Sequence, residues 1–329
     1  MKQRIVLVTG GTGYVGSVLV PRLAEEGYKV RVYCSQLFGN SISGLEGVEF
    51  IQGDIRDTTL LDKAMEDVTQ VVHLAGVVTD ELVAMNTALA YQVNVEATAE
   101  LCRIGLSHKI SRLVYASSSS VYGSVNHDAT EDDIPYPQTE YARMKLDGEK
   151  VIREYRDDFT VTYLRSATAC GPAPRMRLDT IVNIFSKQAW FDQRITVHGG
   201  DQWRSNIHVQ DVAEAYRALM EASAHLVQNQ VFNCTRTNLQ ASGIAYLVGH
   251  VYKAYGTCTI DVDLTQKDTR NYRLSSQKLT DILAWSPQRS ITQAIEDNFA
   301  WFQTGGIQDP NSDLYYNNRR MAPMMKERV

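Results

Sequence analysis

Residues 4–16 read RIVLVTGGTGYVG, an apolar run that ends in a glycine-rich loop. The run predicts a buried strand, and the residues that follow it predict a helix. In such a turn one glycine adopts a positive φ, a second lets the backbone approach a diphosphate, and a third permits close packing of the helix, whose N-terminus stabilises negative charge. The segment therefore predicts a dinucleotide-binding loop, with these cofactor-binding residues: Gly10, Gly13, Tyr14, Val15 and Gly16.

Apolar runs of strand length alternate with helical patterns through the first half of the chain. Val, Ile and Leu dominate these runs, which favours a parallel sheet covered by helices on both faces. The chain is therefore predicted to be α/β, with a doubly wound parallel sheet. The expected strands are 4–8, 29–33, 48–51, 70–74, 112–116 and 161–165.

The second half reads as a smaller lobe made of two separate pieces. The alternation stops at a Pro- and Arg-rich loop at 171–177 and a helix from about 179 to 191. It returns with a helix at 209–220 and a strand at 231–234, which we expect to be one more crossover and strand of the first sheet. From about residue 241 two or three helices and a polar tail follow. The predicted dinucleotide-binding domain is 1–166 plus about 207–238, and the predicted substrate lobe is about 167–206 plus 239–329.

Composition restricts the class of protein and its partners. The 329 residues are 44% hydrophobic and 22% charged, as expected for a folded chain. The net charge of −5 provides no basic field for nucleic acid or an anionic membrane. The longest uncharged stretch, 5–21, holds four glycines and cannot span a bilayer, and no signal-peptide pattern precedes it. Five scattered cysteines have no metal-ligand spacing. We therefore expect a cytoplasmic protein without a metal site.

The end of the second predicted strand bears on the choice of cofactor. An acidic residue there commonly binds the adenosine ribose, but this chain has Cys34 and Ser35. No obvious arginine for a 2′-phosphate is present either, although Arg31 lies nearby. These residues leave NAD and NADP open. After the third strand, Asp54 is placed to accept a hydrogen bond from an adenine amino group, beside Ile55; a solvated loop carboxylate is the alternative.

Tyr141 and Lys145 are four residues apart in a predicted helix at 138–155, so their side chains leave the same face. A neighbouring ammonium and the positive nicotinamide of a bound cofactor favour the phenolate and are expected to lower the pKa of Tyr141, which then acts as a base. Ser118 follows the strand at 112–116, at the carboxyl end of the sheet, and can hydrogen-bond a substrate oxygen. The neighbouring hydroxyls fit a loop that caps itself better than they fit catalysis: Ser117, Ser119 and Ser120.

Several motifs together resemble the extended short-chain dehydrogenase/reductase family, in particular its sugar-nucleotide epimerases and dehydratases. They are Thr-Gly-x-x-Gly-x-x-Gly at 9–16, Gly53-Asp54, His73-Leu74-Ala75-Gly76, Asn94, a Ser before Val121-Tyr122-Gly123, and Tyr141-x-x-x-Lys145. The resemblance covers essentially the whole chain. It implies a Rossmann-type fold, NAD as cofactor, a nucleoside-diphosphate sugar as substrate, and a homodimer formed through the helices near 93–106 and 138–155.

The resemblance also implies roles for individual residues. His73 is expected to be structural, beside the cofactor. The segment 171–179, with Asn183, looks like a subgroup motif that includes epimerases and a heptose-nucleotide 4-dehydrogenase. Thr168 stands where many relatives carry a diphosphate-binding Asn. The implied catalytic residues are Ser118, Tyr141 and Lys145. The further cofactor-binding residues implied are Leu74, Ala75, Gly76 and Asn94. The implied substrate-binding residues are Ser118, Ser119, Tyr141, Thr168, Asn183 and two diphosphate-binding arginines, Arg204 and Arg270.

The residues after Ser118 bear on the reaction. Similar 4,6-dehydratases carry an Asp-Glu pair there, related decarboxylases a Glu, and ketosugar epimerase-reductases a Cys at the place of Ser120, whereas this chain has Ser119 and Ser120. A hydroxyl of ordinary pKa cannot replace those carboxyls. The expected chemistry is oxidation of the sugar C4 carbinol, with Tyr141 as base. We favour an epimerase. A 4-dehydrogenase or 4-ketoreductase with net redox uses the same residues, and a cofactor-binding sensor or scaffold is the non-enzymatic alternative.

Overall fold

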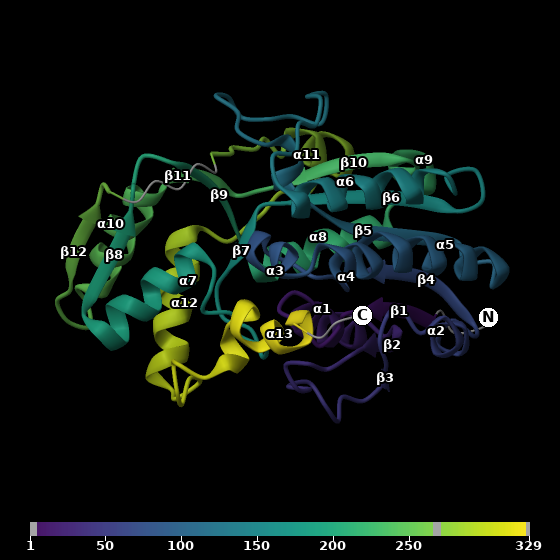
Figure 1. The fold of residues 1–329 in the computed structure, drawn as a ribbon, viewed down its shortest axis with the longest axis horizontal. Helices are drawn as coiled ribbons and strands as arrows, with labels where there is room; N and C mark the ends of the chain where they lie inside the picture. The colour runs from purple at the N-terminus through teal and green to yellow at the C-terminus, as the bar shows by residue number, and fades with distance from the viewer. Residues whose placement is uncertain (1–4, 266–270, 327–329) are drawn as a thin grey trace.

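The computed structural model describes residues 5–265 and 271–326. Its centre is a seven-stranded sheet, order β10-β6-β5-β4-β1-β2-β3, in which all neighbouring strands run parallel (Figure 1). This confirms the predicted doubly wound sheet, and every predicted strand lies within two residues of its observed bounds. The strands are β1 (Ile5–Thr9), β2 (Lys29–Cys34), β3 (Val48–Gln52), β4 (Val68–His73), β5 (Arg112–Ser118), β6 (Thr160–Ser166) and β10 (Gln230–Cys234).

Helices cover both faces of this sheet. Along β1, Val6 and Val8 belong to one apolar cluster and Ile5 and Leu7 to the other, because successive side chains of a strand point to opposite faces. The first cluster includes α1 (Gly16–Glu25) and α8 (Val209–Glu221), which pack against each other. The second includes α2 (Thr58–Ala64), α5 (Ala97–Ser107) and α6 (Glu140–Arg153).

Two connections at the carboxyl edge of the sheet carry short helices. After β4 the chain forms α3 (Asp80–Met85), α4 (Thr87–Tyr91) and the π-helical turn η1 (Gln92–Glu96), which continues into α5. After β5 it forms the 3-10 turn η2 (Ser119–Tyr122) before α6. Both connections face the second lobe, so they are placed to form one wall of a site between the lobes.

The second lobe contains two small sheets, β11-β9-β7 and β12-β8. The chain leaves it through β9 and α8 and returns to the large sheet, where β10 pairs parallel with β6 as predicted. The short helix α9 (Ala224–Val227) precedes β10 and packs on β6 and β10. The elements of the second lobe are β7 (Thr168–Cys170), α7 (Ile181–Lys187), the π-helical η3 (Gln188–Asp192), β8 (Arg194–His198), β9 (Trp203–His208), β11 (Thr237–Gln240), α10 (Ala241–Tyr252), β12 (Thr259–Asp263), α11 (Gln277–Leu283), α12 (Ile291–Gln303), η4 (Asp313–Tyr315) and α13 (Asn317–Lys326).

The expectation of a polar tail was wrong in one respect. Residues 317–326 form the helix α13, which packs against α3 of the first lobe (Figure 1). Met321 and Met325 are buried there with Val77, Leu82 and Val83. The apolar contacts of a few methionines therefore give a segment of polar composition a fixed place beside the sheet.

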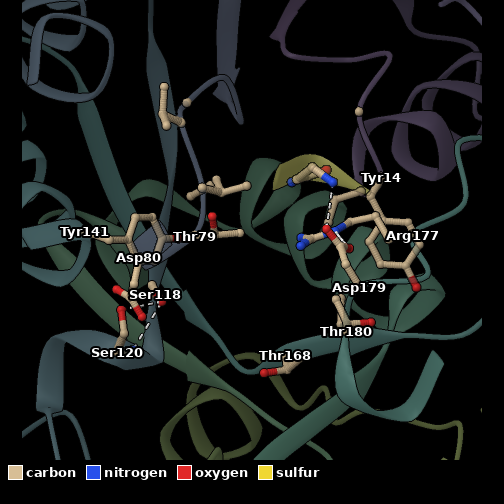
Figure 2. Close-up of a pocket in the computed structure, with 18 of the residues that line it drawn as sticks. Tyr14, Thr79, Asp80, Ser118, Ser120, Tyr141, Thr168, Arg177, Asp179 and Thr180 are labelled. Atoms are coloured by element: carbon tan, nitrogen blue, oxygen red, sulfur yellow. Dashed lines mark hydrogen bonds and ion pairs between the residues drawn. The ribbon is translucent and has the colours of Figure 1, made fainter. Parts of the chain in front are cut away.

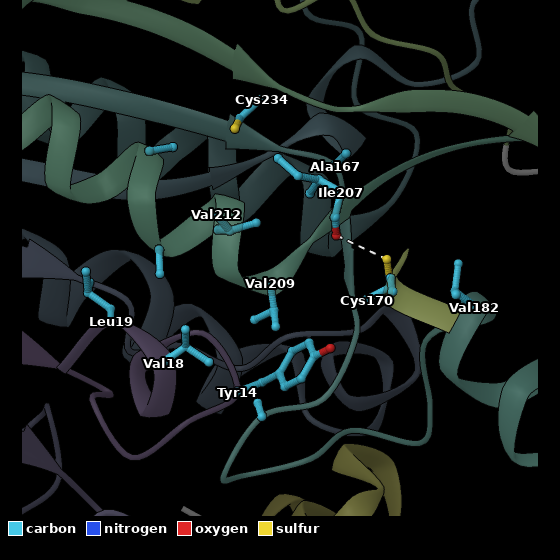
Figure 3. Close-up of a cluster of buried hydrophobic side chains, with 14 of the residues drawn as sticks. Tyr14, Val18, Leu19, Ala167, Cys170, Val182, Ile207, Val209, Val212 and Cys234 are labelled. Carbon is cyan, nitrogen blue, oxygen red and sulfur yellow. Dashed lines mark hydrogen bonds between the residues drawn. The ribbon is translucent and has the colours of Figure 1, made fainter. Parts of the chain in front are cut away.

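The core continues from one lobe into the other. Figure 3 shows Tyr14 and Val18 of the first lobe close to Val209 and Val212 of α8, with Cys170 of β7 nearby. This shared core fixes the second lobe over the carboxyl edge of the sheet. None of the helices within the described residues is long and apolar enough to cross a membrane.

Candidate active site

A cavity of about 870 Å³ lies between the carboxyl edge of the large sheet and the second lobe (Figure 2). Open α/β sheets bind ligands at this edge. The cavity brings together most of the residues singled out in the sequence: Gly10, Gly13, Tyr14, Val15, Gly16, Cys34, Ser35, Asp54, Ile55, Leu74, Ala75, Gly76, Ser118, Ser119, Tyr141, Lys145, Thr168 and Arg204.

Tyr141, Lys145 and Ser118 converge on this cavity. Thr139 caps α6, its hydroxyl accepting from the Ala142 N–H at 3.2 Å, and so fixes the start of the helix that carries Tyr141 and Lys145. The Lys145 ammonium donates to the Ala116 carbonyl at 2.8 Å. Ser118 ends β5, and Figure 2 shows it close to Tyr141.

Burial controls the acid–base properties of these groups. We expected the Lys145 ammonium and a bound nicotinamide together to lower the pKa of Tyr141; in the protein alone, desolvation raises the pKa of Tyr141 to about 12. The hydrogen bond with Ser118 and the charge of Arg177 oppose this rise, whereas Asp80 adds to it. Burial lowers the pKa of Lys145 to about 8. In the protein alone Tyr141 is therefore a neutral phenol at physiological pH.

A buried ionic network supports the helix that carries Tyr141. Glu149, two turns further along α6, accepts from Arg165 at 2.9 and 2.7 Å and from the Ser117 hydroxyl at 2.5 Å. Arg165 also donates to the Tyr122 hydroxyl at 2.9 Å. Ser117 is thus structural, as expected, while the Ser120 hydroxyl donates to Ser118 Oγ at 2.9 Å.

His73 is enclosed by two threonines. Its ring nitrogens lie 2.6 Å from Thr9 Oγ1 and 3.0 Å from Thr98 Oγ1. Burial, with a smaller effect of Lys145, lowers the pKa of His73 to about 3, so the ring is neutral. These contacts agree with the structural role expected for His73.

The glycine loop fits a dinucleotide. Gly10 has φ +71°, and a Cβ there would lie 2.8 Å from Ala75 N; at Gly16 it would lie 2.6 Å from the Gly11 carbonyl oxygen. Bare backbone is therefore required for the tight turn into α1, whose N-terminus opens on the cavity. These features match an extended diphosphate ligand lying across the loop.

The adenosine end of the cavity departs from the predicted contacts. Cys34 Sγ lies 3.1 Å from Thr12 Oγ1. Arg31 is bonded to Glu49 at 2.7 Å and to two backbone carbonyls, so it is engaged away from a 2′-phosphate. The Asp54 carboxylate lines the cavity, but it accepts from Arg56 with both oxygens, at 2.9 and 2.7 Å.

Two predicted site residues lie outside the cavity wall, and one cannot be placed. The Asn94 side chain exchanges hydrogen bonds with Val77 N and O at 2.8 and 2.9 Å, which joins it to the loop that carries Gly76. Asn183 is fully buried, with its amide bonded to Gly171 N, the Tyr14 hydroxyl and the Arg177 carbonyl. Both amides are thus bonded to other groups of the protein, and their binding roles stay predictions. Arg270 lies outside the described residues.

Arg204, Thr168 and Ser119 line the cavity, and their predicted contacts with a substrate stay predictions. Arg204 lines the cavity and is buried, with its guanidinium 5.4 Å from the Tyr272 ring centroid and bonded to the Trp203 carbonyl at 2.8 Å. Thr168 faces the cavity from β7 (Figure 2). Ser119 is buried and also lines the cavity.

Sequence reasoning missed several cavity residues. Figure 2 shows Asp80 on the side of Tyr141 and Ser118, and Arg177 with Asp179 on the side of Tyr14. The Pro- and Arg-rich motif at 171–179 was a usable signal for the arginines, because paired arginines in a loop suit anion binding. The cavity residues of α13 gave no such signal.

A glycine loop after the first parallel strand, with Ser, Tyr and Lys at the end of β5 and on α6, defines the short-chain dehydrogenase/reductase class. The chain belongs to the NAD dependent epimerase/dehydratase family, whose sequence model matches residues 6–235.

Known proteins similar to this chain carry epimerase names. It is 28% identical over 326 residues to UDP-glucose 4-epimerase of Halalkalibacterium halodurans, covering 90% of this chain and 95% of the relative. It is 25% identical to the putative UDP-glucose 4-epimerase of Methanocaldococcus jannaschii, covering 91% and 98%. The structure of UDP-glucuronic acid 4-epimerase from Bacillus cereus, solved with UDP-glucuronic acid and NAD, superposes with a TM-score of 0.80 at 24% identity, covering 91% of this chain and 99% of that chain.

Proposed function

We propose that this protein is an NAD-dependent nucleoside-diphosphate-sugar epimerase that inverts C4 through transient oxidation. The observation that carries the proposal is the convergence of Ser118, Tyr141 and Lys145 on a cavity long enough to reach from the glycine loop into the second lobe. Family membership and the epimerase names of the relatives support it.

The residues divide the work as follows. The glycine loop would hold the diphosphate of NAD and Lys145 its nicotinamide ribose, since both line the cavity. NAD would supply a hydride acceptor for oxidation of the sugar. Tyr141 takes the proton of the C4 hydroxyl, and Ser118 donates a hydrogen bond to the same oxygen. Because the pKa of Tyr141 is about 12 in the protein alone, phenolate forms only when more positive charge enters the cavity. The proton transfer is therefore linked to binding.

We propose NAD over NADP because residues 34–41, which end β2 and follow it, include no Lys or Arg. Cys34 occupies the position of the ribose-binding acid, and Arg31 is engaged by Glu49. NAD content is measured by mass spectrometry of the nucleotide released from the purified protein. NADP in that extract contradicts this assignment.

The proposal extends to assembly and location. We propose a homodimer through the helices near 93–106 and 138–155, which are α5 and α6; Leu106 of α5 is 42% exposed in the single chain. Light scattering of the purified protein measures the mass. We also propose that the protein works in the cytoplasm, since all five cysteines are free thiols, and that the domain boundaries follow the sequence prediction.

The reaction is tested with a panel of nucleoside-diphosphate hexoses, starting with UDP sugars. Inversion at C4 without accumulation of reduced cofactor is expected. Accumulated NADH identifies the dehydrogenase, and loss of water identifies a dehydratase. Binding of cofactor without any turnover identifies the sensor or scaffold.

Tyr141→Phe is the matching variant. It removes the hydroxyl and keeps the ring, so we expect turnover to fall by at least about 100-fold, within the range for loss of general base catalysis, while NAD content is unchanged. Unchanged turnover would show that Tyr141 is not the base.

A further inference from the structure

Arg175 is a buried cation that has no carboxylate of its own. The residue is 5% exposed, and its Nη2 donates to the neutral Asn317 side chain at 2.5 Å. Within residues 5–265 and 271–326, its Nε has no acceptor and no carboxylate lies within ion-pair distance of it. The neighbouring Asp179 is bonded to Arg177 and to the Asn317 backbone N–H, each at 2.7 Å.

An uncompensated charge is costly to bury. Burial and the like charge of Arg177 lower the pKa of Arg175 to about 9, the direction expected when a guanidinium lacks a counter-ion. Buried charges in proteins are paired or bind ions. Arg175 lines the cavity, so an anionic ligand can supply the missing charge.

The position of Arg175 indicates which part of a ligand it meets. Its backbone N–H donates to Ser17 Oγ at 3.2 Å, in the first turn of α1, and its guanidinium lies 3.7 Å from the Phe38 ring centroid, in the loop after β2. The Tyr14 hydroxyl donates to the Gly171 carbonyl at 2.5 Å. The loop that carries Arg175 is therefore attached to the glycine loop and to the N-terminus of α1, where a diphosphate is stabilised by the helix dipole.

We propose that Arg175, on the second lobe, is a ligand of the cofactor diphosphate and that α13 holds it in place, so that both lobes grip the dinucleotide. The proposal rests on the proposed function for the identity of the ligand. It adds a binding residue from outside the Rossmann-type domain.

Helix α13 makes the contacts that are needed to hold Arg175 in place. The Thr79 hydroxyl donates to Asn318 Oδ1 at 2.6 Å, and Arg320 Nε donates to the Leu37 carbonyl at 2.6 Å, so the helix is bonded to the loops after β4 and β2. Its first residue, Asn317, bonds both Arg175 and Asp179. The dinucleotide then leaves only when these contacts open. An enzyme that returns its hydride to the same substrate benefits from retaining its cofactor, whereas a net-redox enzyme must exchange it.

The test compares Arg175→Met with wild type and uses ADP-ribose, which carries the diphosphate without the nicotinamide. The charge-assisted contact predicts that Arg175→Met weakens ADP-ribose binding by about 10- to 100-fold in calorimetry, and that adenosine binding is unchanged. It also predicts that the melting temperature of the ligand-free variant is equal to or above that of wild type, because an unpaired buried charge has gone. Arg175→Lys should fall between the two proteins in ADP-ribose affinity.

Arg319→Met is the matched control. Arg319 is on α13, two residues after Asn317, but it stacks on Tyr316 and donates to the Asn311 carbonyl outside the cavity wall, so ADP-ribose affinity should be unchanged. Equal ADP-ribose affinity of Arg175→Met and wild type overturns the proposal. If the ligand-free melting temperature of the variant is also lower than that of wild type, the role of Arg175 is purely structural. A loss confined to NADP assigns Arg175 to a 2′-phosphate and overturns the diphosphate assignment.

The proposed function and the proposed role of Arg175 can be refuted independently. If wild type binds ADP-ribose through Arg175 but epimerises no sugar nucleotide, only the proposed function is wrong. If wild type binds no dinucleotide at all, both are wrong.

Discussion

Glu149→Gln tests whether the buried network under α6 holds the catalytic helix in place. Glu149 and Arg165 are both nearly inaccessible and form two hydrogen bonds of 2.9 and 2.7 Å, with Ser117 as a third partner of the carboxylate. The glutamine keeps the shape but leaves the Arg165 charge buried without its counter-ion. Breaking one side of such a pair costs about 3–5 kcal/mol. We therefore expect a loss of that size in the free energy of unfolding.

The loss is measured by urea unfolding, followed by tryptophan fluorescence at neutral pH. The control is Glu140→Gln on the same helix, because Glu140 pairs with Arg143 at the surface and an exposed pair contributes at most about 1 kcal/mol. Replacing both buried partners, Glu149→Leu with Arg165→Met, should recover much of the loss, since no charge is then left unpaired.

Activity gives a second measurement. Glu149 raises the pKa of Lys145 against the larger effect of burial, so its neutralisation lowers that pKa further below about 8. The alkaline fall of kcat should then move to lower pH. If Glu149→Gln costs no more than Glu140→Gln and leaves the pH profile in place, the network does not support the catalytic helix and the reasoning is refuted.

Three further predictions concern other parts of the site. Burial gives His73 a pKa of about 3 in the folded protein against 6.5 in the unfolded chain, so its contribution to stability is complete above pH 6.5 and is lost as the pH falls toward 3. His73→Gln should weaken this acid dependence by up to roughly 5 kcal/mol, seen as a shift of the acid-unfolding midpoint to lower pH. An unshifted midpoint speaks against a buried neutral ring. Asp80→Asn should lower the pKa of Tyr141 and move the acidic limb of the kcat profile to lower pH; movement to higher pH contradicts the assigned charge effect. Gly10→Ala should abolish NAD retention, because its Cβ would lie 2.8 Å from the Ala75 backbone. The control Gly27→Ala is also at positive φ but has no atom within 4 Å, so it should cost only about 1 kcal/mol of stability and retain NAD in the purified protein. Equal NAD content in the two variants counts against the steric argument.

The large sheet was predictable because its information is local. Each strand is a short run of Val, Ile or Leu, and burial on both faces makes that run readable without any partner. The meeting of Ser118, Tyr141 and Lys145 at one cavity was predictable for a similar reason, since Tyr141 and Lys145 are related by one helix period and Ser118 follows a strand. The choice of Ser118 among its neighbouring serines also needed the family resemblance.

Other features depend on contacts between distant segments. The sequence of α13, with Pro323 and few apolar residues, does not predict a helix; Met321 and Met325 acquire their role only by packing on Val77 and Leu82. The hydrogen bonds between the Asn94 amide and the Val77 backbone have no local sequence pattern either. The rise in the pKa of Tyr141 in the protein alone could not be predicted, because burial, which outweighs the nearby charges there, has no local sequence pattern.

The position of α13 has a consequence for how the protein is made. The cavity joins the glycine loop at residues 10–16 to Asn317 and Asn318, so its walls are separated by about 300 residues of chain. At a synthesis rate of about 5–20 residues per second, the loop leaves the ribosome some 15–60 s before the helix that covers it. During that interval the emerging sheet must be held by its own apolar core. The cofactor can contribute its full binding energy only after the last helix has docked.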